Sequence, residues 1–229
     1  MSLDITFTNT YHEIPLELPK PAKMLLPQWY KDTDSYFFGE KKPLKDNFIP
    51  ATIKRCIPVF DAITSGYIIT LPQDIYVSQH EGYPKYQWRS FEAIQEHPIE
   101  QATLHPMAND KPFPKFLNPW AIQTPKGYSC LFITPMHHDL PFSIMPGVVD
   151  TDNYNTPVNF IFSLNDQSFE GMIPQGTPMA QVIPFKRDEW TIKEGGEKEK
   201  KLSEKITATV QLGYFDRYKN LFRVKKEYN

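Results

Sequence analysis

Hydrophobic and polar residues alternate in several short segments of this 229-residue chain. A period of two places successive side chains on opposite faces of a β-strand. The clearest case is PVNFIFSL, in which Val158, Phe160, Phe162 and Leu164 fall on one face. Further strands are predicted at residues 5–8, 66–71, 75–79, 85–91, 119–123, 128–134 and 179–185.

Two segments between these strands lack the alternation. Residues 92–115 show no clear period and are predicted to form a loop. CIPVFDA, residues 56–62, is interpreted as a strand or a buried turn. The stretch 146–187 therefore has the most definite order: a turn with paired aspartates, an alternating strand, a second strand, a proline- and glycine-containing turn, and a final apolar strand.

The C-terminal region follows a different period. Behind the charged run EGGEKEKK, residues 194–201, apolar side chains recur every three to five residues, which is typical of an amphipathic helix: Leu202, Ile206, Val210, Phe215, Tyr218 and Phe222. Residues 198–229 hold nine basic and four acidic residues. We favour a helix that docks on the sheet, with packing on a second copy of the chain as the next interpretation. A nucleic-acid-binding arm is unlikely, because the excess of charge is small.

Proline and aromatic residues determine the predicted fold class. The chain has 22 prolines, 10 glycines and 14% aromatic residues. Proline interrupts helices and is confined to edges and turns of sheets, whereas aromatic residues favour strands. We predict a mainly β, distorted β-barrel-like domain of short strands with long proline-rich loops, plus a C-terminal amphipathic helix. Residues 1–50 would wrap a β core at 51–190, and 191–229 would form a linker and helical arm, all within one structural domain.

Net charge and cysteine content limit the expected binding partners and the expected cellular compartment. The formal net charge of −2 gives no general reason to expect a nucleic-acid or anionic-membrane partner. No apolar run reaches the roughly 18–20 residues of a membrane span, and the polar N-terminus does not resemble a signal peptide. Cys56 and Cys130 are isolated, as in proteins of a reducing compartment. We therefore expect a cytoplasmic protein with two buried structural cysteines. A catalytic role for Cys56, beside Arg55, is the weaker interpretation.

Four segments carry a resemblance to known proteins: residues 56–75, 118–132, 139–162 and 170–190. They resemble an uncharacterised family of proteins from tailed phages and bacteria. VVDTDNY (148–154) and IPQGTPMAQVI (173–183) are also distantly similar in order and spacing to motifs of the β-clip fold of dUTP pyrophosphatases and dCTP deaminases.

The second resemblance implies site residues. The aspartate that orients water would correspond to Asp150, or less well to Asp152. The tyrosine that stacks on deoxyribose would be Tyr154, and the glutamine of the last strand would be Gln181. LFITPMHHDL (131–140) lacks the arginine-containing phosphate-binding motif of that fold, and the glycine-rich C-terminal motif is missing as well. Triphosphate chemistry needs cationic and N–H donors, so the resemblance does not carry that activity.

Two pairs of polar residues can be interpreted either as structural or as metal-binding. Asp150 and Asp152 lie in VDTDNYN, where short polar side chains stabilise a turn; a cation site is the alternative. His137 and Asp139 form an H-x-D pair, as in the facial triad of iron enzymes. That triad needs a later histidine, and none follows His138. A surface loop is the favoured interpretation, and we expect no metal and no cofactor.

Two functional classes remain. The first is a noncatalytic β-domain that binds or assembles, with the C-terminal arm forming a homo-oligomer. The second is a small-molecule or nucleotide-processing enzyme at Asp150, Tyr154 and Gln181, with Trp29, Trp88 or Trp120 as a stacking wall. The first is favoured by the proline-rich loops and the helical arm; in addition, no GxSxG, P-loop or dinucleotide-binding motif is present. The ligand remains undefined.

Overall fold

The structure is a computed structural model that describes residues 3–37, 51–101, 104–107, 113–211 and 216–229. Its internal contacts divide the chain into two units. Unit 1 comprises Met1–Pro27, Ile63–Arg187 and Tyr228–Asn229; unit 2 comprises Gln28–Ala62 and Asp188–Glu227. These limits differ from the predicted segments 1–50, 51–190 and 191–229, because residues 28–62 group with the C-terminal region.

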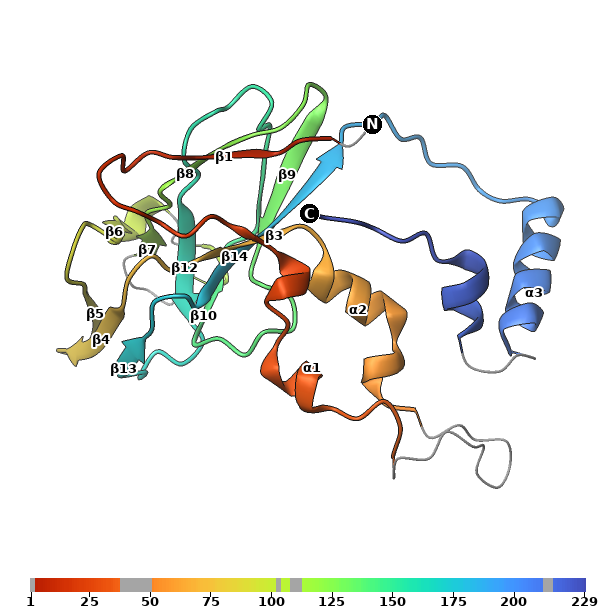
Figure 1. Ribbon diagram of the computed structural model, residues 1–229, viewed down its shortest axis with the longest axis horizontal. Coiled ribbons are helices and arrows are strands. Elements are labelled where there is room, and N and C mark those ends of the chain that lie inside the picture. Colours follow the sequence, from red (N-terminus) through yellow and green to blue (C-terminus); the bar gives the residue numbers. More distant parts are fainter. Residues whose placement is uncertain (1–2, 38–50, 102–103, 108–112, 212–215) are drawn as a thin grey trace. The chain divides into compact units, whose positions relative to one another are not determined.

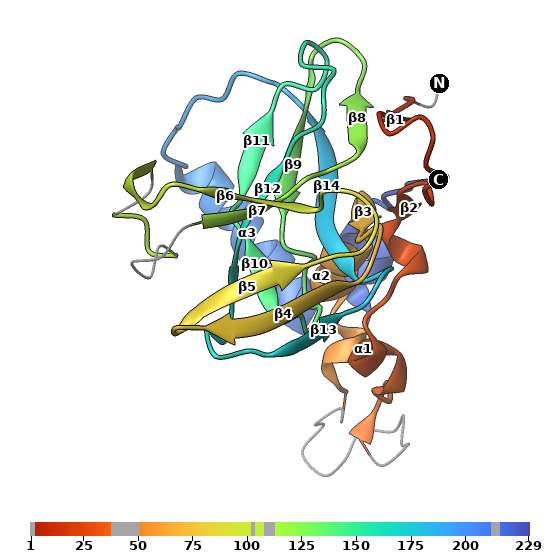
Figure 2. The same ribbon diagram turned by 90° about the vertical axis from the view of Figure 1, so that its left-hand side faces the viewer.

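Unit 1 is built from antiparallel sheets. The largest has the order β11-β9-β14-β3-β2, formed by Gly147–Val149, Tyr128–Ile133, Pro178–Lys186, Tyr67–Thr70 and Lys20–Pro21. Its longest strand, β14, lies between β9 and β3 (Figure 2). The register pairs Gln181 with Ile133 on one side and with Ile68 on the other.

Three smaller sheets complete the strands of this unit. A four-stranded sheet has the order β10-β12-β7-β6, from Phe142–Ile144, Phe160–Leu164, Phe113–Phe116 and Ile94–His97. A three-stranded sheet has the order β13-β4-β5, from Gly171–Ile173, Ile75–His80 and Tyr83–Gln87. A two-stranded sheet pairs β1, Thr6–Asn9, with β8, Trp120–Gln123. The strands of these three smaller sheets are labelled in Figure 1.

The protein is mainly β, as the sequence predicted. The described strands form several small antiparallel sheets, and none of these sheets closes into a barrel. The predicted barrel-like closure is therefore not observed among the described residues. The described strands are divided among four sheets of two to five strands, and each of these sheets keeps two edge strands, as an open sheet does.

The core of unit 1 is rich in phenylalanine. The rings of Phe116 and Phe162 stack with centroids 3.8 Å apart, and Phe142 meets both rings edge-on. All three residues are at most 1% exposed. Phe160, Phe162 and Leu164 are buried on alternate positions of β12, as the period-two pattern predicted. Val158 lies before the strand and is only half-buried.

The predicted loop at 92–115 was wrong, because β6 and β7 lie within its limits or at its end. Pro114 concealed β7 from the sequence pattern. This proline pairs with Glu96 of β6, while β7 pairs with β12 at Lys115 and Phe116. Proline lacks an N–H and is tolerated where one side of a strand is unpaired.

The interpretation of residues 56–62 as a strand or buried turn was also wrong. Ile57–Thr64 form helix α2. Pro58 falls in its first turn, where the missing N–H has no intrahelical partner to lose. The segment is thus a helix that begins at a proline, and its apolar run was mistaken for that of a strand.

Strand β5 begins two residues earlier than predicted. It follows β4 through Glu81 and Gly82, both of which have positive φ, 52° and 80°. Two consecutive positive φ values are the signature of the tight type I′ hairpin turn. The turn fixes the register so that His80 faces Tyr83.

Unit 2 contains helix α1 (Gln28–Asp32), most of α2 and helix α3 (Glu197–Gln211), together with a 3₁₀ turn at Ile53–Arg55. Two further 3₁₀ turns, Ala22–Met24 and Ile99–Gln101, belong to unit 1. Tyr30 is buried, and its ring lies against that of Phe60. Its hydroxyl donates to the Lys54 carbonyl at 3.1 Å. A π-helical turn, Tyr218–Phe222, follows α3, and Phe215 lies outside the described residues.

Ion pairs tie the C-terminal segment to the earlier part of unit 2. Asp61, 11% exposed in its side chain, binds Arg223 Nη2 at 2.6 Å and Lys226 Nζ at 2.9 Å. Arg55 pairs with Asp216. Burial raises the pKa of Asp61, but its hydrogen bonds to Arg223 and Lys226 outweigh burial and lower the pKa overall. The segment after α3 is therefore held to α2 by charge.

Candidate functional site

A turn between β11 and the segment before β12 positions the predicted aspartates. The Asp150 carbonyl accepts the N–H groups of Asn153 at 3.0 Å and Tyr154 at 2.9 Å. Thr151 is fully buried, and its hydroxyl lies 2.7 Å from that of Thr124. The Asp150 side chain before it is 60% exposed, whereas the Asp152 side chain after it is 2% exposed. The turn therefore presents one carboxylate to the surface and covers the other.

Arg187 joins the two aspartates. Its Nη1 donates to Asp152 Oδ1 at 2.9 Å, and its Nη2 contacts Asp152 Oδ2 at 2.5 Å, which is the bidentate arrangement of a strong ion pair. The same Nη1 lies 3.3 Å from Asp150 Oδ1. Ser129 donates its hydroxyl to Asp150 Oδ1 at 2.7 Å. The carboxylates are thus bound by Arg187 and Ser129 beyond the turn itself.

The two carboxyl groups have different surroundings. The Asp152 side chain is 2% exposed and also accepts the Gly127 N–H at 2.8 Å. The hydrogen bonds from Arg187, assisted by that from Gly127, lower the pKa of Asp152 to about 2. The Asp150 side chain is 60% exposed. Asp152 is therefore a structural anion, whereas Asp150 can contact a ligand.

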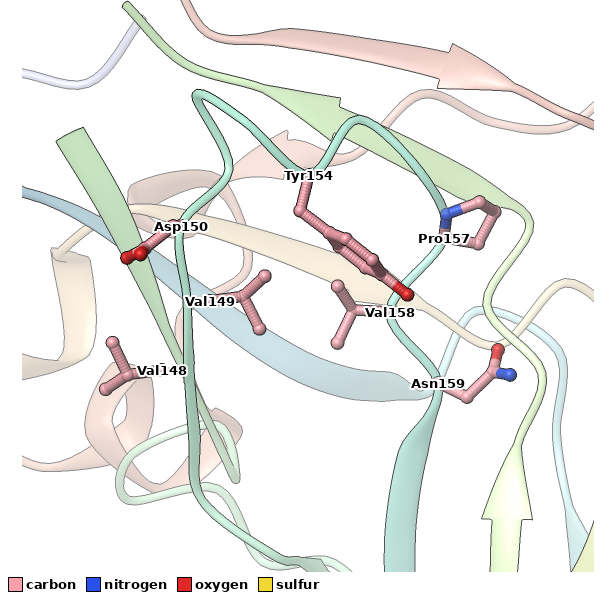
Figure 3. A pocket seen from close by; sticks show the side chains of 7 residues that line it. All are labelled: Val148, Val149, Asp150, Tyr154, Pro157, Val158 and Asn159. Carbon is pink, nitrogen blue, oxygen red and sulfur yellow. The ribbon is translucent and has the colours of Figure 1, made fainter. Parts of the chain in front are cut away.

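An open hollow with a volume of about 570 Å³ lies beside this turn. Figure 3 shows its lining: Val148, Val149, Asp150, Tyr154, Pro157, Val158 and Asn159. The Tyr154 ring extends across the hollow toward Val158 and Asn159 (Figure 3). Four apolar side chains with a few polar groups form a combination that is common in small-molecule sites.

Gln181 does not line this hollow. It is fully buried, its Oε1 accepts the Met136 N–H at 2.8 Å, and its Nε2 donates to the Ser65 carbonyl at 2.7 Å. Both ends of the amide therefore bind the backbone. The structure brings together Asp150, Asp152 and Tyr154, and it places Gln181 inside the sheet as a link between two loops.

The tryptophans do not line the hollow either. Trp120 is 6% exposed and borders a separate small cavity of about 50 Å³, near Leu71 and Gln175. Trp88 packs against the core of unit 1. Trp29 contacts Tyr30 in unit 2, with ring centroids 5.5 Å apart. None of these three tryptophans is among the residues that line the hollow beside Asp150.

His137 and Asp139 are exposed in the connection between β9 and β10. His137 has a positive φ of 62°, a conformation typical of a tight turn. Among the residues that the structure describes, no group of three or more histidine, cysteine, aspartate or glutamate side chains is arranged to hold a metal ion.

Both cysteines are free thiols. Cys130 is fully buried in β9, and burial raises the pKa of its thiol to about 11. A raised pKa keeps the group protonated and unreactive at neutral pH. Cys56 is half-buried, which differs from the predicted full burial.

The sequence analysis missed Arg187, Ser129 and Asn159 as members of this site. Ser129 and Arg187 come from β9 and the end of β14, which pair in the sheet and bring Ser129 opposite Phe185. Arg187 directly follows β14, so its position after the last predicted strand was a usable signal. Its partner could not be read, because Asp152 is 35 positions away in the chain and is brought near only by the pairing of β9 with β14 and with β11.

No family model matches the chain, and no curated protein matches its sequence. Within the described residues, none of the helices is both long enough and apolar enough to cross a membrane.

Proposed function

We propose that this protein is a noncatalytic β-domain module that assembles with a second copy of itself through the C-terminal arm, residues 197–224. The observation that carries the proposal is an apolar stripe on α3. Leu202, Ile206 and Val210 are 57%, 38% and 41% exposed. Their spacing of four residues places them on one face of the helix.

The stripe belongs to unit 2, which has further exposed apolar side chains. Other large apolar side chains that precede or follow α3 in the sequence are exposed one by one: Trp190, Ile192, Tyr218, Leu221, Phe222 and Val224. Single exposed apolar residues are ordinary, but a concentration of them on one region is typical of a protein-binding surface.

The charges of α3 favour a second copy as the partner. The helix contains four lysines and three glutamates, interspersed along EKEKKLSEK. The near balance of lysines and glutamates leaves little repulsion between two copies of the helix. A polyanionic partner such as nucleic acid would instead require an excess of positive charge.

The alternative function, an enzyme acting on a nucleotide or another small molecule at Asp150 and Tyr154, has less support. The seven residues that line the hollow include no cation. Arg187, the nearby guanidinium, is engaged by Asp152. Phosphoryl chemistry needs positive charge on the phosphates. The β-clip similarity, the relation to phage and bacterial proteins and a cytoplasmic location stay predictions from the sequence.

The proposal is tested by the mass of the protein in solution. We expect the wild-type chain to show at least twice its 26.7 kDa mass in light scattering at micromolar concentration. The triple variant Leu202→Gln, Ile206→Gln, Val210→Gln should be monomeric, because glutamine preserves helix propensity and removes the apolar stripe. The control variant Lys200→Gln, Glu204→Gln, Ala208→Gln changes the opposite face and should keep the wild-type mass. A monomeric wild type, or a triple variant that still assembles, contradicts the proposal.

A further inference from the structure

We propose that the free edge of strand β11 takes up residues 189–193 of a second copy of the chain as an added β-strand. Trp190 and Ile192 of this strand would point toward the neighbouring hollow. The inference rests on the assembly proposed above and names a second contact for it, which involves a sheet edge and not α3.

Strand β11 is the outer strand of the largest sheet, beside β9 (Figure 2). It follows β10 after only two residues, but β10 pairs with β12 whereas β11 pairs with β9. The chain therefore passes from one sheet to another between these two strands. Because of this change of sheet, β11 has a neighbour on one side only among the described strands.

The hydrogen-bond pattern shows which main-chain groups lie on this free edge. In antiparallel strands, successive residues direct their N–H and C=O groups to opposite sides of the strand. The Arg187 N–H donates to the Gly127 carbonyl, so the odd-numbered residues of β9 face β14 and Cys130 faces β11. Cys130 pairs there with Val149, which leaves the N–H and C=O of Val148 directed away from the sheet. Within the described part of the chain, neither of these two groups has a hydrogen-bond partner.

The hollow lies on one side of β11, where alternate side chains of an added strand would point. Figure 3 shows Val148 and Asp150 directed to one side of β11 and Val149 directed to the other side, toward Val158 and the ring of Tyr154. A strand added at Val148 follows the same alternation, so that every second side chain stands beside Val149. Main-chain hydrogen bonds then provide affinity, and the apolar lining favours large apolar side chains at these positions.

Residues 189–193, EWTIK, have the pattern that this edge requires. They lie between β14 and α3 in neither helix nor strand, and their main chain forms no hydrogen bond with the described residues. The Trp190 side chain is 89% exposed and that of Ile192 is fully exposed, and both alternate with polar residues. Tryptophan, threonine and isoleucine also favour strands. The chain thus contains both an unpaired sheet edge beside an apolar hollow and an unpaired segment of matching alternation.

The segment of the same copy cannot place Trp190 in its own hollow. Strand β14, which ends at Lys186, is separated from the free edge of β11 by three strand spacings, about 14 Å. At about 3.3 Å per residue, the crossing takes about four residues, and Trp190 falls within it. The segment of a second copy has no such limit, because it can approach the edge from solvent.

The strand contact adds to the contact through α3 and does not replace it. The free edge offers the two main-chain hydrogen bonds of Val148, each of which contributes roughly a factor of two to ten to affinity. Two copies that lack α3 are therefore expected to stay monomeric at micromolar concentration.

The test is the dissociation constant of the assembled full-length protein, measured by analytical ultracentrifugation. Val148→Pro removes the outward N–H and should raise this constant about tenfold, whereas Val148→Thr keeps the N–H and should change it less than about twofold. Proline is tolerated on an edge strand, and circular dichroism checks that the variant keeps its fold. An unchanged dissociation constant in folded Val148→Pro overturns the proposal.

Variants of the segment test the other side of the contact without touching the sheets. Trp190→Ser should raise the dissociation constant about tenfold, and the matched change Thr191→Ser, on the opposite side of the added strand, should not. In the double variant Val148→Pro, Trp190→Ser the two losses should not add, because both remove the same contact. Wild-type assembly in Trp190→Ser, or full additivity in the double variant, overturns the pairing.

A peptide distinguishes failure of this inference from failure of the proposed assembly. The full-length triple variant of α3, labelled with ¹⁵N, is titrated to millimolar concentration with a synthetic peptide of residues 188–194. We expect saturable amide shifts at residues 147–150 and 154–159, and none with the peptide that carries Trp190→Ser and Ile192→Ser. Binding supports the strand contact even if the wild-type chain is monomeric. No binding, or shifts elsewhere only, overturns it even if the copies assemble through α3.

Discussion

The ion pair between Arg187 and Asp152 makes the turn beside the hollow sensitive to acid. The hydrogen bonds from Arg187 lower the pKa of Asp152 to about 2, below its ordinary value of 3.8. A carboxyl group with a lowered pKa stabilises the folded state when it is ionised in both states, above about pH 4. This stabilisation is lost as the pH falls from about 4 to about 2.

The first prediction follows from the lowered pKa of Asp152. Arg187→Met should lower the midpoint of thermal unfolding above pH 5 and should flatten its decline between pH 4 and pH 2, because the pKa of Asp152 then moves toward its ordinary value. The measurement is thermal unfolding by circular dichroism from pH 2 to pH 6. Lys126→Met, which removes an exposed positive charge, serves as the control. Parallel curves for Arg187→Met and wild type would refute this account.

Gln181 matches a motif residue of a ligand-binding fold, yet its role in this structure is structural. Its amide connects the Met136 N–H to the Ser65 carbonyl from the middle of β14. Buried polar groups of the backbone need such partners, and a side chain from a central strand can supply both. The resemblance to enzymes of the β-clip fold pointed to this residue, while its contacts are internal.

At the scale of elements, Gly66 determines how α2 is followed by β3. It has a φ of 70°, and a Cβ at this position would lie 2.0 Å from the Val182 carbonyl oxygen of β14. Glycine is therefore required for two reasons, the left-handed backbone and the close approach of the neighbouring strand. The tight turn directs the chain from the helix straight into the largest sheet.

The second prediction compares two glycines. Gly66→Ala should lower the free energy of unfolding by at least about 3 kcal/mol, since backbone strain is added to a steric clash with β14. Gly82→Ala has a similar φ of 80° with no atom within 4 Å of the added Cβ. It should cost only about 1 kcal/mol for the left-handed conformation. Urea unfolding of both variants measures the difference, and equal losses would show that the contact with Val182 contributes little.

At the scale of the whole molecule, the two units suggest separate roles. Unit 1 contains the sheets, the phenylalanine core and the hollow. Unit 2 contains α3, its exposed apolar stripe and the ion pairs of Asp61. We expect stability to reside mainly in unit 1 and assembly to reside in the C-terminal part of unit 2.

The third prediction is the effect of a truncation. Removal of residues 198–229 should convert the assembled protein to a monomer and leave the β-type circular dichroism and cooperative unfolding of unit 1. Some stability is lost, because Tyr228 packs on Tyr67 and Asn229 binds Lys23 within unit 1. A separate variant, Tyr228→Ala in the full chain, measures that loss without removing α3. A truncated chain that keeps its assembled mass would contradict the division of roles.

The sequence by itself determined the mainly β class, most strands outside 92–115, and the turn that carries Asp150 and Asp152. These features depend on local patterns, namely alternation, turn-forming residues and proline. It did not determine α2, because the apolar run after Pro58 is compatible with a buried strand as well as a helix. The sequence pattern also missed β7, in which Pro114 pairs with a neighbouring strand on one side only.

Only the tertiary structure decided the partners of the candidate site. Arg187 reaches Asp152 because β14 pairs with β9 and β9 with β11, and Gln181 is buried because β14 is a central strand. Arg187 thereby binds Asp152 from 35 positions away in the chain and the Tyr128 carbonyl from 59 positions away. No local period records them, since they depend on which strands become neighbours when the core is formed.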